Sequence, residues 1–120
     1  MLFKKALQGI QFETGKATIM MRSYTILNQI AGVLIANPTY LIEIRGHTDN
    51  VGNALSNKLL SQKRAASVLK YLEGKGVDVK RMTANGYGDT LPVVSNKTIA
   101  GKTLNRRVEF EVSFEEVTLH

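Results

Sequence analysis

The stretch LIEIRGHTDNVG, residues 41–52, contains the change in pattern that decides the fold. Its first half alternates apolar and polar residues, which is typical of a strand with one covered and one wetter face. The alternation predicts a strand over residues 41–47 with two isoleucines inward and three polar side chains outward: Ile42 and Ile44, then Glu43, Arg45 and His47. Gly46 and Gly52 give the following segment conformational freedom, and a helical pattern begins after it.

The pattern on either side of this stretch predicts two helices and three more strands. A helix from about residue 18 has apolar residues at intervals of three and four and ends before Pro38. Its stripe is Met20, Tyr24, Leu27, Ala31 and Leu34. A second helix spans residues 53–73, and the remaining strands span residues 10–12, 81–87 and 106–114, with a loop over residues 89–103.

The predicted order is β-α-β-α-β-β, with strands that are polar on one side. Half-polar strands exclude a doubly wound sheet with helices on both faces. We therefore expect an α+β fold, a two-layer sandwich in which a mixed four-stranded sheet carries both helices on one face.

The second helix carries both apolar and charged stripes. Its apolar stripe, which we expect to be core, is Leu55, Leu59, Ala66 and Leu69. Asn57 and Arg64 are seven residues apart and share another stripe on roughly the opposite side. This pattern predicts that Asn57 and Arg64 point away from the deepest core.

Length and composition indicate a single domain, residues 1–120. The net charge is +6, but the basic residues form no run and no aromatic-rich basic strand, so we expect no nucleic-acid partner. Cysteine is absent, and no stretch is apolar enough to span a membrane. The first residues lack a signal-peptide pattern, which leaves a cytosolic protein or a domain cut from a longer secreted chain.

The usual catalytic and metal-binding patterns are missing from the sequence. Glu43, His47 and Asp49 are spaced two apart, but the expected turn at Gly46 breaks their alignment, and no second histidine is near. No serine lies in a nucleophile elbow, and no glycine-rich segment has dinucleotide or P-loop spacing. We expect no enzyme activity, no catalytic residue, no metal and no cofactor.

Asp49 and Arg64 are the two charges most suggestive of a ligand site. Asp49 follows the strand and Arg64 lies in the helix, so both could flank one pocket near the helix start. A carboxylate and a bidentate guanidinium suit a zwitterion, with the helix amino terminus assisting. Three alternatives remain open: a structural Asp49–Arg64 salt bridge, or Asp49 as a turn residue or a helix cap.

Several ordered motifs resemble the OmpA-like C-terminal domain. They are GHTDNVG, Asn57, LSQKRA, NGYGDTLP and SNKTIAGKTLNRRVEFEV. The resemblance as a whole runs from about Ile10 to Val112. This family is the peptidoglycan-binding module that also occurs in peptidoglycan-associated lipoproteins and in flagellar stator MotB proteins. Its β/α/β/α/β-β fold agrees with the order predicted above.

The resemblance implies roles for individual residues. Asp49 would contact the ammonium group of diaminopimelate and Arg64 its carboxylate. Further residues that match pocket-lining or nearby family positions are Asn57, Thr48, Leu60, Asn105 and Arg107. Arg107 could instead pair with a neighbouring glutamate across the sheet, and Lys102 stands where the family often has arginine.

The function that the resemblance implies is noncovalent binding of peptidoglycan through the meso-diaminopimelate of the stem peptide. Such a domain would anchor an outer-membrane or envelope protein to the cell wall from the periplasmic face. Contact with a membrane would come only through parts of the parent protein outside this chain. The alternative is an oligomerising structural module of a motor-stator or secretion complex, for which a homodimer is one candidate state.

Overall fold

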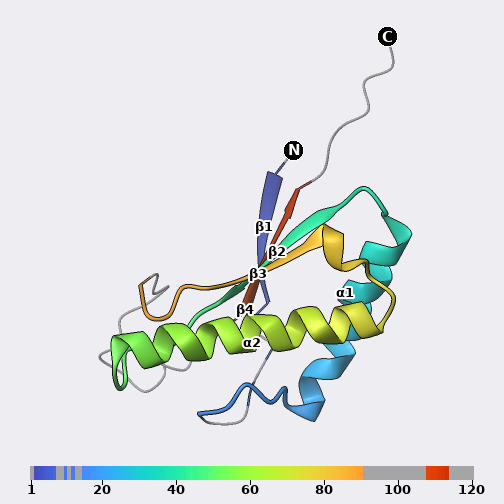
Figure 1. Cartoon of the computed structure of the whole chain (residues 1–120). Helices are drawn as coiled ribbons and strands as arrows, with labels where there is room; N and C mark the ends of the chain where they lie inside the picture. Colours follow the sequence, from blue (N-terminus) through green and yellow to red (C-terminus); the bar gives the residue numbers. More distant parts are fainter. Residues whose placement is uncertain (1, 8–9, 11, 13–14, 91–107, 114–120) are drawn as a thin grey trace.

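The computed structural model describes residues 2–7, 10, 12, 15–90 and 108–113 (Figure 1). Two helices and a mixed sheet confirm the predicted α+β class. The elements in chain order are β1 (Leu2–Leu7), η1 (Met21–Ser23), α1 (Tyr24–Ala36), β2 (Leu41–Gly46), α2 (Ala54–Gly74), η2 (Val79–Arg81), β3 (Met82–Gly86) and β4 (Val108–Ser113).

The sheet has the spatial order β1-β4-β2-β3. Strand β2 pairs in parallel with β3 and antiparallel with β4, while β1 pairs antiparallel with β4. This register aligns Ile44 with Ala84 on one side and with Phe110 on the other. Because side chains alternate along a strand, these rows form one apolar face of the sheet.

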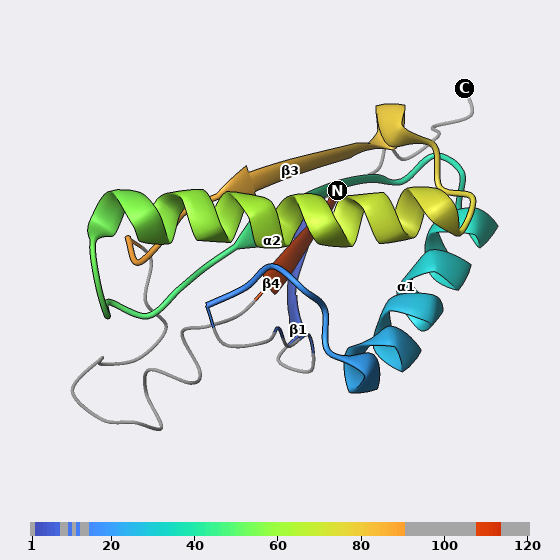
Figure 2. The same ribbon diagram turned by 60° about the horizontal axis from the view of Figure 1, so that its bottom comes forward.

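Both helices contribute to a single core on that face. Leu27 and Leu34 from α1, Val68 and Leu72 from α2, and Ile44 from β2 are all fully or almost fully buried there. Figures 1 and 2 show α2 lying along the sheet, with α1 packed near the carboxyl-terminal end of α2. Among the described helices, none is long and apolar enough to cross a membrane.

The strand predicted over residues 10–12 is wrong, since the first strand lies earlier, at Leu2–Leu7. Ile10 is buried and Phe12 packs against the core, as expected for apolar residues of the fold. However, Phe12 forms only an isolated bridge with Ile19, because the chain reverses between them with Gly15 in a left-handed conformation.

Other element boundaries differ by smaller amounts. Helix α1 begins at Tyr24 rather than near residue 18, after the short η1 turn. Leu27, Ala31 and Leu34 are buried on its inner face, as their spacing predicts. Strand β2 ends at Gly46, one residue earlier than expected. Most of the predicted loop over residues 89–103 lies outside the described residues.

Two glycines at the ends of neighbouring strands allow α2 to approach the sheet closely. A β-carbon at Gly46 would lie 2.2 Å from the main-chain oxygen of Ser61, and one at Gly86 would lie 2.4 Å from the main-chain nitrogen of Gln62. Any side chain at either position would therefore push the helix away. This approach places the amino-terminal half of α2 directly above the carboxyl ends of β2 and β3.

Candidate functional site

Helix α2 buries a different stripe from the one that its leucines suggest. The buried residues are Asn57, Ser61, Arg64, Ala65, Val68 and Leu72. Leu55 is 68% exposed and Leu59 is 56% exposed, so the prediction that they belong to the core is wrong. Ala66 is also exposed, whereas Leu69 is half-buried and packs against the core.

The prediction that Asn57 and Arg64 point away from the core is also wrong, because both residues lie on the buried stripe of α2. Asn57 is 8% exposed and Arg64 is 5% exposed. At Gly46 and Gly86 the strands approach α2 at Ser61 and Gln62, which leaves space only for a small side chain at Ser61 on the inward stripe. The apolar series Ala65, Val68 and Leu72, extended backward by helical steps, is the signal that could have identified this face.

The loop after β2 brings Thr48, Asp49 and Asn57 together. The Thr48 amide donates to the Gly88 carbonyl oxygen at 2.8 Å, which ties the loop to the segment after β3. Asn57 Nδ2 donates to the carbonyl oxygens of Val51 at 3.0 Å and of Asp49 at 3.4 Å. These bonds fix the main chain around Asp49 against the first turn of α2.

The Asp49 side chain is 6% exposed and takes part in a local turn. Its Oδ1 accepts a hydrogen bond from the Val51 amide at 3.0 Å, as in the turn alternative raised from the sequence. The helix-cap alternative is wrong, because the cap is Asn53, whose side chain accepts from the amides of Leu55 and Ser56.

The Arg64 side chain is held by a segment far away in the sequence. Its Nε donates to the Lys16 carbonyl oxygen at 3.1 Å, and its guanidinium carbon lies 5.2 Å from the centre of the Phe12 ring. Phe12 and Lys16 are contacts that the sequence reasoning did not assign to the site. The apolar pattern of residues 10–12 followed by Gly15 was the available signal, but it indicated only a strand and a turn.

Of the remaining predicted site residues, the structure describes only Leu60. Leu60 is half-buried on α2, between the inward stripe and the exposed leucines. Asn105, Arg107 and Lys102 lie outside the described residues. Within the described part, Asp49 supplies a buried carboxylate in the loop after β2, and Arg64 supplies a buried guanidinium on α2.

The opposite face of the sheet carries a polar network rather than a second core. Arg45 Nε lies 3.0 Å from Glu43 Oε1, and Arg45 Nη1 donates to Glu111 Oε2 at 3.2 Å. The guanidinium also lies over the Tyr87 ring at 4.5 Å. A side-chain hydrogen bond with Tyr87 and the nearby carboxylates raise the pKa of Arg45, against the opposing effect of burial, so this group stays charged.

His47 lies at the end of this network and is 1% exposed. Its Nε2 is 3.2 Å from Glu109 Oε2, and its ring stacks on Tyr87 with centroids 5.6 Å apart. Among the described residues, no group of three histidine, aspartate or glutamate side chains is close enough to hold a metal ion. His47 thus packs as a support between β2 and β4.

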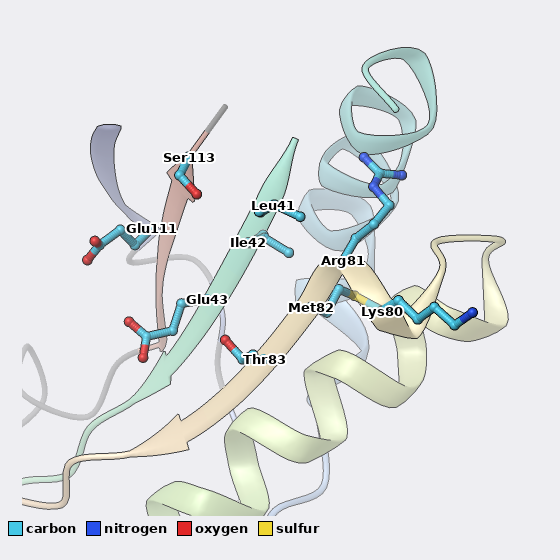
Figure 3. Close-up of a pocket in the computed structure, with 9 residues that line it drawn as sticks. All are labelled: Leu41, Ile42, Glu43, Lys80, Arg81, Met82, Thr83, Glu111 and Ser113. Atoms are coloured by element: carbon cyan, nitrogen blue, oxygen red, sulfur yellow. The ribbon is translucent and has the colours of Figure 1, made fainter. Parts of the chain in front are cut away.

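A cavity of about 250 Å³ lies at the other end of β2, where the strand begins (Figure 3). Glu43 and Glu111 point away from the helices, while Arg81 reaches toward α1 and donates to the Leu34 and Asn37 carbonyl oxygens. Both carboxylates already form ion pairs with Arg45. The cavity is lined by Leu41, Ile42, Glu43, Lys80, Arg81, Met82, Thr83, Glu111 and Ser113, none of them predicted for the site.

Comparison with known proteins gives a consistent set of relatives. The sequence profile of the OmpA family matches residues 11–106. The chain is 39% identical to outer membrane porin F of Pseudomonas fluorescens over 86% of its own length, and 38% identical to the peptidoglycan-binding protein ArfA of Mycobacterium bovis over 87%. It spans only 32% of the length of each of these two relatives.

A solved structure agrees with this result. The peptidoglycan-associated lipoprotein from Burkholderia pseudomallei superposes with a TM-score of 0.82 at 30% identity, covering 87% of this chain and 88% of that one. The family profile covers most of the chain, including the loop after β2 and all of α2. Together with the resemblance seen in the sequence motifs, these matches establish that the chain belongs to the OmpA family.

Proposed function

We propose that this chain is a noncatalytic module that binds peptidoglycan through the diaminopimelate of the stem peptide. Asp49 would hold the ammonium group and Arg64 the carboxylate, with Asn57, Thr48 and Leu60 lining the same site. Arg107 is proposed to complete it from the segment before β4. Two relatives are named for peptidoglycan, ArfA as a binding protein and the Burkholderia pseudomallei lipoprotein by association, which supports the wall as the partner.

The observation that carries the proposal is the burial of Asp49, in the loop after β2, and of Arg64, on α2. Charged side chains are costly to remove from water unless something compensates them. Arg64 lies on the buried stripe of α2, where the other half of the same helix places alanine, valine and leucine. A domain that needed only stability would gain more from apolar residues there.

The geometry of α2 is compatible with one small zwitterion reaching both charges. Asn57 binds the main chain of Asp49, and Arg64 follows Asn57 by two helical turns, about 10 Å along the axis. Side chains on a helix lean toward its amino terminus, so a long arginine side chain shortens that separation. Guanidinium binds carboxylate through two parallel hydrogen bonds, which gives the carboxylate a defined orientation.

Isothermal titration with free meso-diaminopimelate tests the proposal. We expect saturable binding by the wild type and its loss, by at least about tenfold, in Asp49→Ala and in Arg64→Ala, because removing one partner of a buried charged contact costs about 2–5 kcal/mol. Lys63→Ala is the matched control, since Lys63 is the exposed cation next to Arg64. Equal binding by the wild type and both site variants would refute the site.

The wider role follows from the same proposal. We infer that the chain is one domain of a longer envelope protein, exposed to the periplasm, which it ties to the cell wall. The proposed ligand requires a free carboxylate, so a wall amidated at that group should bind more weakly. The alternative of an oligomerising module in a stator or secretion complex stays a prediction, for which light scattering of the wild-type domain is the direct test.

A further inference from the structure

Phe12 and residues 15–19 lie close together, and Lys16 among them makes a long-range polar contact with Arg64. Phe12 and Ile19 make a single antiparallel bridge. Between them, Gly15 has φ of +68°, a conformation that other residues adopt at a cost, and it precedes Lys16 at the turn. The turn presents the Lys16 carbonyl oxygen to Arg64, 48 positions further along the chain.

Two contacts of different kinds act on the same guanidinium. The hydrogen bond from Nε to Lys16 fixes one edge of the planar group, and the Phe12 ring lies under the group at 5.2 Å. An arginine side chain otherwise has considerable rotamer freedom, which ligand binding would have to remove. A hydrogen bond at one edge and an aromatic ring against the face together restrict both the position and the tilt of the plane.

We propose that Phe12 and the Lys16 carbonyl group are positioning elements that pre-orient Arg64 for the carboxylate of the ligand. This inference rests on the proposed function, since it takes the zwitterion as the ligand. Phe12 itself does not touch the ligand and acts through Arg64. The Lys16 side chain is exposed and has no part in the effect, because only its main-chain oxygen bonds Arg64.

A positioning role and a packing role of Phe12 predict different effects of its replacement on the affinity for ligands with and without a carboxylate. Phe12 also packs against the core, so replacing it will lower stability whichever role it has. If it acts through Arg64, its replacement weakens only ligands that carry the carboxylate. If it only supports the fold, its replacement weakens all ligands alike.

The experiment is a titration of Phe12→Leu, Phe12→Met, Phe12→Tyr and Lys16→Ala with meso-diaminopimelate and with its diamide, in which neither end carries a carboxylate for Arg64. Circular dichroism confirms folding first, and the two ringless variants guard against one failing to fold. We expect the ringless variants to weaken diaminopimelate binding by about 2- to 30-fold, the range of a cation–π contact. Diamide binding should change by less than about twofold, and Phe12→Tyr and Lys16→Ala should bind like the wild type.

An equal loss for both ligands, or no loss in either ringless variant, would overturn the positioning role. Arginine side-chain NMR provides a readout that needs no ligand. The Arg64 Nε proton should exchange slowly with solvent in the wild type and in Phe12→Tyr, and quickly in Phe12→Leu. If the folded wild type bound neither ligand, the proposed function would fall, and the exchange rate would still decide whether Phe12 and Lys16 hold Arg64.

Discussion

Helix α2 buries one continuous stripe, and the residues on that stripe change character halfway along the helix. In the amino-terminal half the stripe is Asn57, Ser61 and Arg64, while in the carboxyl-terminal half it is Ala65, Val68 and Leu72. The second group packs with α1 and the sheet in the apolar core. The first group bonds to loops instead, through Val51, Gly88 and Lys16.

Under the proposed function, α2 separates folding from recognition along its own length. The apolar half removes hydrocarbon from water, which is the main driving force for folding. The polar half keeps hydrogen-bonding groups at low exposure, where their interactions with a ligand would be stronger than at an open surface. Three substitutions on this helix, two at buried positions and one at an exposed position, would break or sharpen the contrast.

The largest effect is expected in the carboxyl-terminal half. Leu72 is fully buried in the core, so Leu72→Ala should lower the free energy of unfolding by about 2–5 kcal/mol. Urea denaturation followed by circular dichroism measures the change. Below the denaturation midpoint, the folded fraction should still bind diaminopimelate with wild-type affinity. A change in affinity of the folded protein would show that the two halves are not independent.

An intermediate effect is expected at the junction of the two halves. Ser61 Oγ accepts from the Gly88 amide at 2.9 Å and donates to the Lys58 carbonyl oxygen at 2.8 Å. Ser61→Ala leaves the Gly88 amide without this acceptor and should cost about 1–3 kcal/mol in the same denaturation assay. Ser67→Ala is the control, since Ser67 bonds only within its own helix, to Lys63. Equal, small losses in both variants would mean that the Ser61 contact does not hold the loop.

The smallest effect is expected at Leu59, which the sequence pattern assigns to the core. Because the side chain is more than half exposed, Leu59→Ala should change the free energy of unfolding by less than about 0.5 kcal/mol. The free energy of unfolding of Leu72→Ala provides the comparison. A loss of several kcal/mol in thermal or urea unfolding would restore the original assignment and contradict the buried stripe described here.

Local patterns predicted much of the fold correctly. The alternation around Ile42 and Ile44 gave the central strand, and the stripe of Leu27, Ala31 and Leu34 gave the inner face of α1. These elements were readable because their periodicity reflects burial of large apolar side chains. By contrast, the first strand, LFKKAL, was missed because two lysines interrupt its alternation and its partner β4 lies far away in the sequence.

The site was harder to predict than the fold, for a physical reason. Asp49 and Arg64 were singled out by charge and position, yet their burial was not foreseen. The inward face of α2 is set by close contact with Gly46 and Gly86, which periodicity of the helix alone does not reveal. The support of Arg64 by Phe12 depends on a contact between distant segments, which no local pattern in a single sequence encodes.

The most direct test of the account is a two-dimensional NMR titration of the nitrogen-15-labelled wild-type domain with meso-diaminopimelate. The account predicts that amide shifts concentrate in residues 48–64 and around Lys16, while residues 65–74 stay unchanged. Shifts centred instead on the cavity at the start of β2, around residues 41–43 and 80–83, would contradict it (Figure 3). Shifts spread evenly along α2 would likewise contradict the division of that helix into a folding half and a binding half.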